Sequence, residues 1–348
     1  MIVAIQLKLT IYKNDKMSLV ITDHSNNSNI IYNRISKEVN CIDNCYYIKT
    51  KENIKGKRTL KLKIEQLFYI VNGKDNIWKN YKFIKYDEMI YYSQLDEVYT
   101  LYANLSKINP KIMVSRYEEG IFSYDGGEWS GLKVNIANFI RQILKKPILE
   151  KYYKNFYCFY PELYKGHLNC VPIPAIEENS SLKDYLEKLF NVKDNIMEKY
   201  HYRYIFFSSV YDFEGGKPIN ELNLVKQIAN IVGNDNLLVK VHPRDNIERF
   251  KKEGLNVDVN SNIPWEAIQL GNDFSDKIFL TVNSSSVLSV SLLADNPPDI
   301  YYMYKLCDID GNESAINSVK AIKEILSKDF IKNSNLKVYS LEKLDEIL

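Results

Sequence analysis

Cysteines are few in this sequence, and none is placed as a cross-link or a metal site would require. Of the five cysteines only Cys41 and Cys45 lie close together, and no second pair stands at the spacing of a zinc site. An odd number of scattered thiols argues against a disulfide framework and is typical of reduced cysteines in the cytosol. We therefore expect a cytoplasmic chain without a structural metal ion.

Long apolar runs and a strong excess of charge are also missing. The sequence contains no run of about 18 apolar residues that could span a bilayer. The first residues lack the pattern of a signal peptide, so we expect no signal peptide. Lys and Arg number 46 against 44 Asp and Glu, which argues against a general nucleic-acid binder. The sequence leaves open a peripheral association with the inner face of the cell membrane and the formation of a homodimer.

Apolar β-branched runs alternate with stretches of helical period along the chain, which is the pattern of parallel sheets covered by helices. We expect strands at 18–23, 45–48, 81–84, 111–117, 203–209, 237–241, 257–259, 277–283 and 299–303, with strand and loop at 155–163. Helices are expected at 2–12, 30–35, 60–71, 98–108, 134–149, 182–200, 221–232, 247–253, 264–268, 284–293, 316–327 and 341–348. The expected fold class is α/β.

The length of 348 residues predicts two domains. Prolines and polar residues gather at 170–181, so we place the boundary between an N-terminal domain, 1–172, and a C-terminal domain, 173–348. Both halves are expected to be Rossmann-like domains that face each other across a cleft. A doubly wound domain normally opens with a strand, whereas this chain opens in a helix. The hypothesis that follows is that a first strand is missing before Ile2.

One expected strand, 237–241, stops abruptly at His242-Pro243. Proline cannot continue the strand and disfavours a helical start on the residue before it, so His242 is expected at the carboxyl end of the strand. Ligands of open α/β sheets bind at that edge, and Arg244 adds a positive group suited to phosphate or carboxylate. The alternative is a polar loop that contains a structural histidine.

Three further polar motifs fall at strand ends or helix starts: Glu118-Glu119-Gly120, Pro264-Trp265-Glu266 and Ser284-Ser285-Ser286. Serines that begin a helix usually cap its amides, but they can also help to hold a phosphate at the positive end of the helix dipole. The same dipole favours Glu266 in a first turn, where a carboxylate could instead bind the diol of a ribose.

Together these motifs resemble the bacterial sialyltransferases, and most closely those of glycosyltransferase family 52, the lipooligosaccharide and capsule type. Related bacterial sialyltransferases and polysialyltransferases share an acidic-acidic-Gly motif, a His-Pro motif and a later Ser-rich motif. These correspond in order to Glu118-Glu119-Gly120, His242-Pro243 and Ser285-Ser286. The match includes Lys240 to Arg244 and Pro264-Trp265-Glu266 and runs from Ile2 to about Tyr302, and the chain departs from it where the first strand is expected.

The resemblance implies a GT-B fold and an inverting transfer of sialic acid from CMP-Neu5Ac to a terminal galactose of a surface glycan. It implies an α2,3 linkage, with an α2,6 linkage or polymerising transfer left open, and no cofactor or metal. Glu118, or Glu119 as the second choice, would take the proton of the acceptor hydroxyl, and His242 would protonate or hydrogen-bond the departing phosphate. The donor-binding residues implied besides His242 are Pro243, Arg244, Glu266, Ser284, Ser285, Ser286, Ser208 and Ser209.

Two alternatives stay open: a GT-B transferase with another nucleotide-sugar donor, and a non-catalytic nucleotide-binding relative. The Asp-x-Asp spacing of Asp308 and Asp310 is one that metal-dependent glycosyltransferases use, but a turn signature, Gly311-Asn312, follows it. We interpret it as a surface turn. His24 is expected to be a turn residue, and 125–127 a loop.

Overall fold

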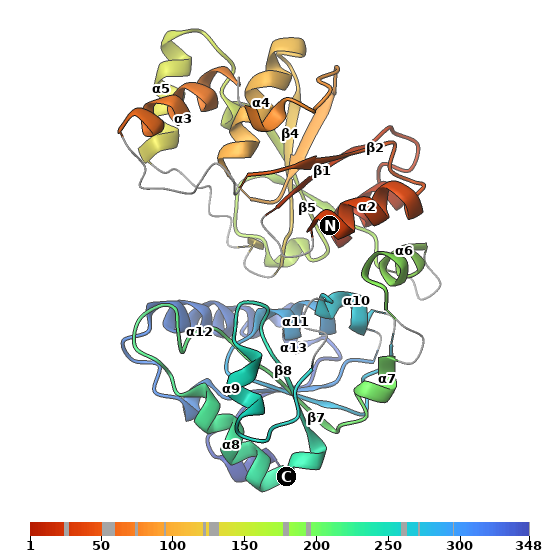
Figure 1. The fold of residues 1–348 in the computed structure, drawn as a ribbon, viewed down its shortest axis with the longest axis vertical. Helices are drawn as coiled ribbons and strands as arrows, with labels where there is room; N and C mark the ends of the chain where they lie inside the picture. Colours follow the sequence, from red (N-terminus) through yellow and green to blue (C-terminus); the bar gives the residue numbers. More distant parts are fainter. Residues whose placement is uncertain are drawn as a thin grey trace. The chain divides into compact units, whose positions relative to one another are not determined.

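The computed structural model describes residues 1–23, 28–50, 60–73, 76–93, 95–120, 123–124, 132–176, 181–192, 196–258, 263–270, 272–294 and 296–347. The chain divides into two compact units. Unit 1 comprises Met1–Glu119 and Ser123–Tyr185, and unit 2 comprises Gly120–Phe122 and Leu186–Leu348. In Figure 1 the elements of unit 1 are coloured from red to green and those of unit 2 from green to blue.

Unit 1 contains two sheets in which every strand pair is parallel. The smaller sheet pairs β1 (Ser18–Thr22) with β2 (Asn44–Ile48). The larger has the order β3-β4-β5-β6, with strands at Glu88–Tyr91, Met113–Tyr117, Tyr153–Cys158 and Asn169–Pro172. The helices of unit 1 are α1 (Ile2–Leu9), α2 (Ser28–Glu38), α3 (Leu60–Asn72), α4 (Asp96–Ile108) and α5 (Leu132–Ile143), with short 3₁₀ turns at Asn76–Trp78, Leu149–Tyr152 and Pro161–Leu163.

The division between the units falls inside α6 (Ser181–Phe190), whereas we predicted it between 172 and 173. Prolines and polar residues at 170–181 favoured a linker there. In the structure β6, which ends at Pro172, pairs with β5 through four residues, from Asn155 opposite Asn169 to Cys158 opposite Pro172. This stretch therefore extends the sheet of unit 1.

Aromatic side chains dominate the core of unit 1. Trp78 is buried beside Tyr81 and donates its indole N–H to Thr100 Oγ1 at 2.7 Å. The predicted strand at 81–84 is wrong, because Tyr81 packs edge-on against the Trp78 ring, with centroids 5.5 Å apart, and the backbone there pairs with no strand. The strand of this region is β3, which begins four residues after Ile84, the end of the predicted range.

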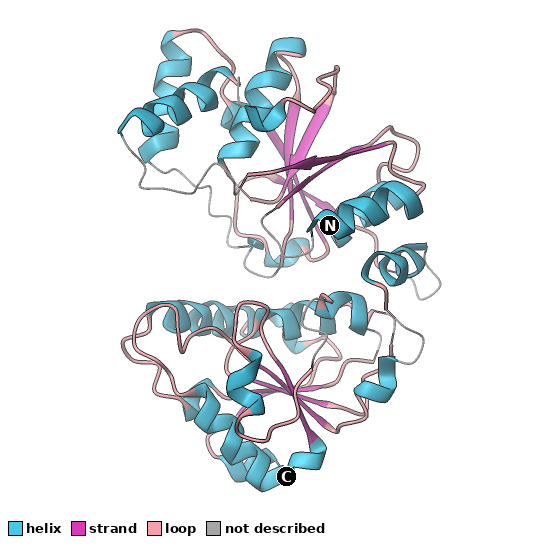
Figure 2. Cartoon of the chain, in the orientation of Figure 1, coloured by secondary structure: helices cyan, strands magenta, loops and turns pink. Residues whose placement is uncertain are grey.

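Unit 2 is built on one five-stranded parallel sheet of order β11-β10-β9-β7-β8. In that order the strands are Val338–Ser340, Asp299–Tyr302, Ile278–Thr281, Tyr204–Phe207 and Leu237–Lys240. The helices are α7 (Ile196–Lys199), α8 (Glu221–Val232), α9 (Ile247–Lys251), α10 (Trp265–Gln269), α11 (Ser285–Ser291), α12 (Glu313–Leu326) and α13 (Asp329–Lys332), with 3₁₀ turns at Asn234–Asn236, Tyr304–Leu306 and Leu344–Ile347. Figure 2 shows the strands in the middle of this unit with helices on either side.

The strand order of unit 2 reverses at β7. The chain passes from β7 to β8 at one edge and then crosses to β9 on the other side of β7, so that in order of appearance the strands lie 2-1-3-4-5. Every residue of β7 and β8 is buried, which explains why all of them except Lys240 are apolar. In sheets of this order ligands bind where the carboxyl ends of the first and third strands meet, which here are β7 and β9.

The predicted α/β class, with two Rossmann-like units built on parallel strands, is confirmed. None of the helices in the described ranges has the length and apolarity needed to cross a membrane.

Candidate functional site

Unit 1 places Glu118 directly after β4, at the carboxyl edge of the four-stranded sheet. The Glu118 N–H donates to the carbonyl of Tyr157 in β5 at 3.0 Å. The N–H of Phe159 donates to Glu118 Oε2 at 2.9 Å, and the hydroxyl of Tyr124 donates to the same oxygen. Within the described part of the chain no group donates to Oε1. The hydrogen bonds to Oε2 hold the carboxyl in place.

Burial sets the proton affinity of Glu118, whose exposed fraction is 8%. It raises the pKa of the carboxyl above its ordinary value, while the hydrogen bonds from Tyr124 and Phe159 act in the opposite direction. A carboxylate with a raised pKa accepts a proton more readily than a solvated one. Glu118 thus has a fixed orientation and a higher proton affinity than a solvated carboxylate.

Glu119 has different surroundings. Its side chain is exposed, and its backbone N–H donates to Ser123 Oγ at 2.9 Å. Nearby protein atoms partly shield the carboxyl from water and raise its pKa, against the lowering effect of the positive chain terminus. The two adjacent glutamates are therefore distinct, since one is buried and held by donors and the other is exposed.

In unit 2 the candidate residues follow three neighbouring strands. Ser208 and Ser209 come after β7, His242 comes after β8, and Ser284 comes after β9. Both Ser208 and Ser209 are buried, and their hydroxyls already bond protein groups. The hydroxyls of these two serines thus hold the loops that follow β7 and β8.

His242 is held at both its backbone and its ring. Its N–H donates to Ser208 Oγ at 2.9 Å, and its Nδ1 accepts the N–H of Arg244 at 3.1 Å. Because Nδ1 accepts a hydrogen bond, the neutral ring carries its proton on Nε2. Burial and the charge of Arg244 lower the pKa of the imidazole, which favours this neutral form. The side chain therefore offers an N–H donor at Nε2.

Arg244 is an exposed ion-pair partner in this structure. Its Nη1 lies 2.8 Å from each carboxylate oxygen of Glu214, and Pro243 beside it is also exposed. The positive group that we predicted for a phosphate or carboxylate is engaged with a carboxylate. A phosphate ligand would have to exchange with Glu214.

Ser284, which follows β9, bonds to Ser286 through its hydroxyl and does not cap α11. Ser284 lies at the N-cap position of α11, but its side chain makes no capping bond. Its hydroxyl lies 2.8 Å from that of Ser286, and its N–H donates to Thr281 Oγ1 at 2.9 Å. Ser285 is the first residue of α11. The commoner capping use of such serines is not seen for Ser284.

Glu266 lies in the first turn of α10 and is half-buried. Burial raises the pKa of its carboxyl, and the charge of Lys240, the last residue of β8, acts against this rise. The neighbouring Trp265 is buried edge-on against Phe207 of β7, with centroids 4.7 Å apart. This contact fixes α10 on the sheet and places Glu266 beside the end of β8.

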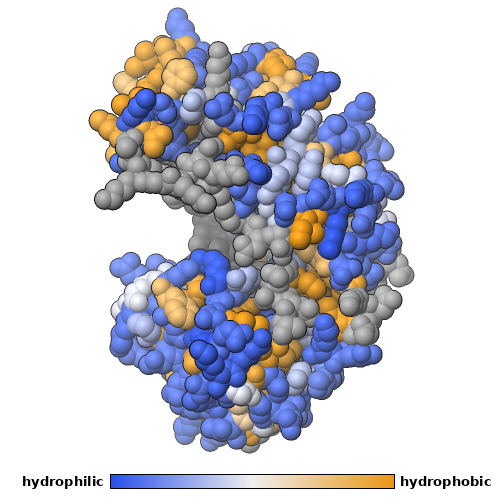
Figure 3. Space-filling model, in the orientation of Figure 1, coloured by the Kyte–Doolittle hydropathy of each residue, from blue (hydrophilic) through white to orange (hydrophobic). Residues whose placement is uncertain are grey.

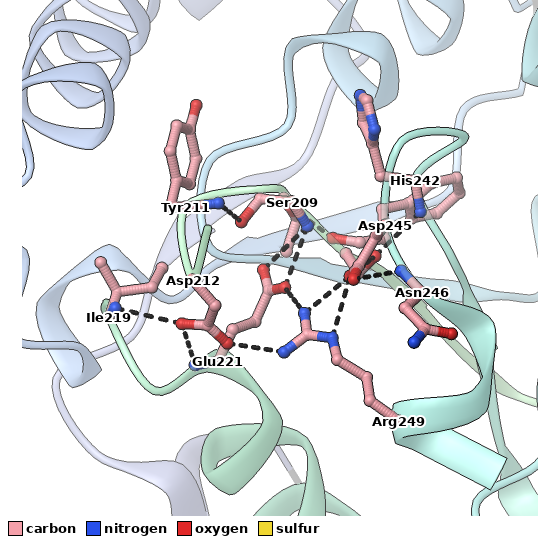
Figure 4. A network of polar contacts seen from close by, with 12 residues as sticks. Ser209, Tyr211, Asp212, Ile219, Glu221, His242, Asp245, Asn246 and Arg249 are labelled. Atoms are coloured by element: carbon pink, nitrogen blue, oxygen red, sulfur yellow. Dashed lines mark hydrogen bonds and ion pairs between the residues drawn. The ribbon is translucent and has the colours of Figure 1, made fainter. Parts of the chain in front are cut away.

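A buried charge network links the loops that follow β7 and β8 (Figure 4). Arg249 of α9 pairs with Asp212 at 2.6 Å, with Asp245 at 2.6 Å and with Glu221 at 3.3 Å. The Arg249 side chain is 13% exposed, and those of Asp245 and Glu221 are fully buried. One cation thus faces three carboxylates in a site that is largely shielded from solvent.

The network reaches the candidate residues through two serines. Asp245 Oδ2 accepts the hydroxyl of Ser208 at 3.4 Å, and that hydroxyl oxygen accepts the N–H of His242. Both oxygens of Glu221 accept the N–H of Ser209 at 3.0 Å. Our sequence analysis missed this network, and the one available signal was the spacing of four between Asp245 and Arg249, which suits an ion pair.

The raised pKa of Glu221 predicts that the stability of the fold depends on pH. Burial raises the pKa of its carboxyl from 4.5 to about 7. Between these values the folded state keeps a proton that the unfolded state releases, so this group's stabilising effect is lost as the pH rises. We expect the free energy of unfolding of the wild type, relative to Glu221→Gln, to fall by about 3 kcal/mol between pH 4.5 and 7. Urea denaturation of both proteins measures it, and parallel pH profiles would contradict it.

Other candidate metal and turn residues show no site. Among the described residues no group of three or more His, Cys, Asp or Glu side chains could hold a metal ion. Asp308 pairs with Lys217 at 2.5 Å on the surface and accepts the N–H of Asp310 at 3.2 Å, as a turn does. His24 and 125–127 lie outside the described residues.

The sequence profile of the alpha-2,8-polysialyltransferase (POLYST) family matches residues 2–301. No curated protein sequence matches the chain. One similar solved structure is the alpha/beta-galactoside alpha-2,3-sialyltransferase of the luminous marine bacterium Photobacterium phosphoreum, with 14% identity, a TM-score of 0.46, and coverage of 96% of this chain and 100% of that one. Another is a sialyltransferase of Photobacterium damselae, residues 113–497 corresponding to the GT-B domain, with 10% identity, a TM-score of 0.47, and coverage of 93% and 100%. A third is S. aureus MnaA with UDP, with 12% identity, a TM-score of 0.41, and coverage of 95% and 94%.

Proposed function

Because this chain belongs to the alpha-2,8-polysialyltransferase family, we propose that it is a sialyltransferase whose donor is CMP-Neu5Ac. The observation that carries the proposal lies at the carboxyl edge of the sheet in unit 2. There His242, in its neutral form, presents an Nε2–H donor next to the strand pair where sheets of this order bind ligands. A donor of this kind suits the phosphate of a leaving nucleotide.

The leaving group is CMP, and we assign its stabilisation to residues of unit 2. As the bond between the anomeric carbon and the phosphate oxygen breaks, negative charge grows on the phosphate, and a hydrogen bond from His242 Nε2 strengthens with it. The lowered pKa of this imidazole favours hydrogen bonding over full protonation of the phosphate. Ser285 and Ser286 at the start of α11 add hydroxyl and backbone donors, and Glu266 holds the cytidine ribose.

The acceptor is activated by Glu118 in this proposal. The acceptor hydroxyl attacks the anomeric carbon of sialic acid in one displacement, which inverts its configuration, and its proton passes to Glu118 Oε1. The support for Glu118 over Glu119 is the pair of hydrogen bonds that hold Oε2 and leave Oε1 available. The mechanism requires no metal, and the reaction takes place in the cytoplasm.

Two acceptors are candidates. The sequence resemblance implies a galactose hydroxyl and an α2,3 product on a lipooligosaccharide or capsule, as in glycosyltransferase family 52. The description of the matched family favours the 8-hydroxyl of a terminal sialic acid, which would extend an α2,8-linked chain. The acidic-acidic-Gly, His-Pro and Ser-rich motifs are common to both groups, so the acceptor must be determined by assay.

A panel of donors and acceptors tests the proposal. The chain is incubated with CMP-Neu5Ac, UDP-sugars or GDP-sugars, each with lactose or with oligosialic acid and a chelator, and the products are identified by mass spectrometry. We expect transfer from CMP-Neu5Ac alone, with no loss when the chelator is present. Transfer from another nucleotide sugar would contradict the assigned donor, and CMP binding without any transfer would indicate a non-catalytic relative.

Two replacements of His242 separate its donor from its acceptor. In His242→Gln the amide N–H stands near the place of Nε2–H, whereas His242→Asn keeps an acceptor near Nδ1 for the Arg244 N–H and loses the donor. Loss of one donor to a developing charge costs about 10²–10³-fold in kcat. We expect this loss in His242→Asn and a smaller one in His242→Gln, with little change in KM. Equal kcat in both variants and the wild type would mean that His242 takes no part in the reaction.

A further inference from the structure

Unit 1 carries a large exposed apolar surface, which we call the α3–α5 surface. Its members are large apolar side chains on two helices that pack together, among them Leu132 at 78% exposure, Leu60 at 74% and Phe139 at 64%. The full set is Leu60, Leu62, Ile64 and Phe68 of α3, Leu132, Ile136, Phe139 and Ile143 of α5, and Leu144 directly after α5. Figure 3 shows orange side chains gathered at the upper left, where α3 and α5 lie in Figure 1.

Helical spacing aligns these side chains into stripes. On α5, Ile136, Phe139 and Ile143 follow one another at intervals of three and four residues, so they share one face. The opposite face of α5 turns Val134 and Ala137 into the core of unit 1. A surface helix normally has one apolar face, whereas α5 has an apolar face toward the core and another toward solvent. Exposed patches of this kind mark interaction sites.

Polar contacts fix both helices in the folded unit. Arg141 of α5 is buried and donates to the carbonyls of Ile70 in α3 and, at 3.0 Å, of Pro147. Lys133 at the start of α5 pairs with Asp96 of α4 at 2.6 Å. The outward stripe is therefore a built feature of the folded unit and not the face of a detached helix.

The charges around the surface have one dominant sign. Among the basic residues of these helices and of the positions after them, Arg141 is buried and Lys133 pairs with Asp96, which leaves Lys61, Lys63, Lys145 and Lys146. Glu65 is the one acidic residue within α3 and α5. Lys61, Lys63 and Lys145 are exposed. Large apolar side chains bordered by lysines match the interface of an anionic bilayer, where apolar groups reach the acyl boundary and ammonium groups meet lipid phosphates.

A second copy of the chain is a less suitable occupant. In a two-fold symmetric dimer the same surface would face itself, so that the lysines on α3 would meet like charges. An anionic lipid surface instead attracts each of these lysines. We propose that the α3–α5 surface docks unit 1 on an anionic membrane, with Phe139, Ile143 and Leu132 in the acyl boundary and Lys61 and Lys63 at the phosphates. This surface is separate from the residues assigned to sugar transfer and does not depend on that function.

Vesicle sedimentation of the whole chain tests the docking. The chain is mixed with vesicles of phosphatidylcholine alone or with added phosphatidylglycerol, and the bound fraction is measured. We expect binding to the anionic vesicles that weakens with salt. Phe139→Ser with Ile143→Ser should lower the partition at least about tenfold because it removes inserted apolar area, and Lys61→Gln with Lys63→Gln should lower it by about fivefold per lysine on anionic vesicles.

A matched pair of apolar residues elsewhere serves as the control. Ile30 of α2 and Ile316 of α12 are 43% and 40% exposed and lie off the α3–α5 surface. Ile30→Ser with Ile316→Ser should bind vesicles like the wild type. Equal binding of the wild type to neutral and anionic vesicles, or no binding to either, would overturn the proposal. So would a wild-type dimer in light scattering that Phe139→Ser with Ile143→Ser turns into a monomer. The lysine variant replaces exposed polar side chains only, so it tests docking even if the serine variant does not fold.

Discussion

Replacing Glu118 by glutamine is expected to lower kcat for sialyl transfer by about 10²–10⁴-fold, the usual worth of a general base. The amide keeps the size of the side chain and an oxygen to accept the Phe159 N–H, but it cannot take a proton. Because the donor site is assigned to unit 2, the affinity for CMP should stay unchanged. Steady-state kinetics with CMP-Neu5Ac and calorimetric titration with CMP measure the two quantities.

Glu119→Gln is the matched control for this prediction. It changes the adjacent residue by the same atoms, but that carboxyl is exposed and is not held by the two donors that fix Glu118. We expect Glu119→Gln to keep most of the wild-type kcat. If instead Glu119→Gln lost activity and Glu118→Gln kept it, the base would be Glu119 and our assignment would be wrong.

The largest expected loss of stability comes from Arg249→Met. The variant leaves Asp212, Asp245 and Glu221 without the cation that they share in a nearly dry site. Breaking a buried ion pair by removing one partner costs about 3–5 kcal/mol, because the remaining charge stays buried. We expect the free energy of unfolding at pH 7 to fall by about this amount in urea denaturation. The loss should shrink in acid, where the carboxyls are protonated.

Arg244→Met provides the comparison for Arg249→Met. Its partner is also a carboxylate, Glu214, but the two side chains are 62% and 45% exposed. Exposed pairs contribute at most about 1 kcal/mol, so the stability of this variant should stay close to that of the wild type. Similar losses in the two arginine variants would mean that burial of the network is not what makes Arg249 important.

The central strands of unit 2 could be predicted well because their sequence has one explanation. β7, β8 and β9 are short, mostly apolar runs that are buried except at Ile278, and the predicted ranges 203–209, 237–241 and 277–283 contain all three. The predicted helix at 221–232 coincides with α8. Since the strands were placed, the positions of Ser208, His242 and Ser284 at strand ends followed from the sequence alone.

Short strands with weak patterns could not be predicted. β3, β6 and β11 are only partly buried, so they lack the continuous apolar run that marks β7 and most of β8. β6 lies in the proline-containing stretch that we interpreted as a linker, and it becomes a strand because β5 pairs with it. The helix predicted at 341–348 is wrong in its described part, where the chain forms a 3₁₀ turn at Leu344–Ile347 after β11.

The charge network and the α3–α5 surface required the structure for different reasons. Asp212 and Arg249 are 37 positions apart in the sequence, and only the neighbouring positions of β7 and β8 bring them together. An apolar stripe such as Leu60, Ile64 and Phe68 predicts a helix in contact with something, but its period does not say whether the core or the exterior covers it. The three motifs did not distinguish family 52 from the polysialyltransferases, because both groups have them.

The anomeric configuration of the transferred sialic acid tests the account most directly. The chain is incubated with CMP-Neu5Ac and the better of the two acceptors, and NMR of the isolated product determines the configuration of the new bond. We predict an inverted centre in the wild-type product and about 10²–10⁴-fold slower formation of the same product by Glu118→Gln. A product with retained configuration, or an acceptor that stays unchanged with the wild-type chain, would contradict a single displacement that Glu118 initiates.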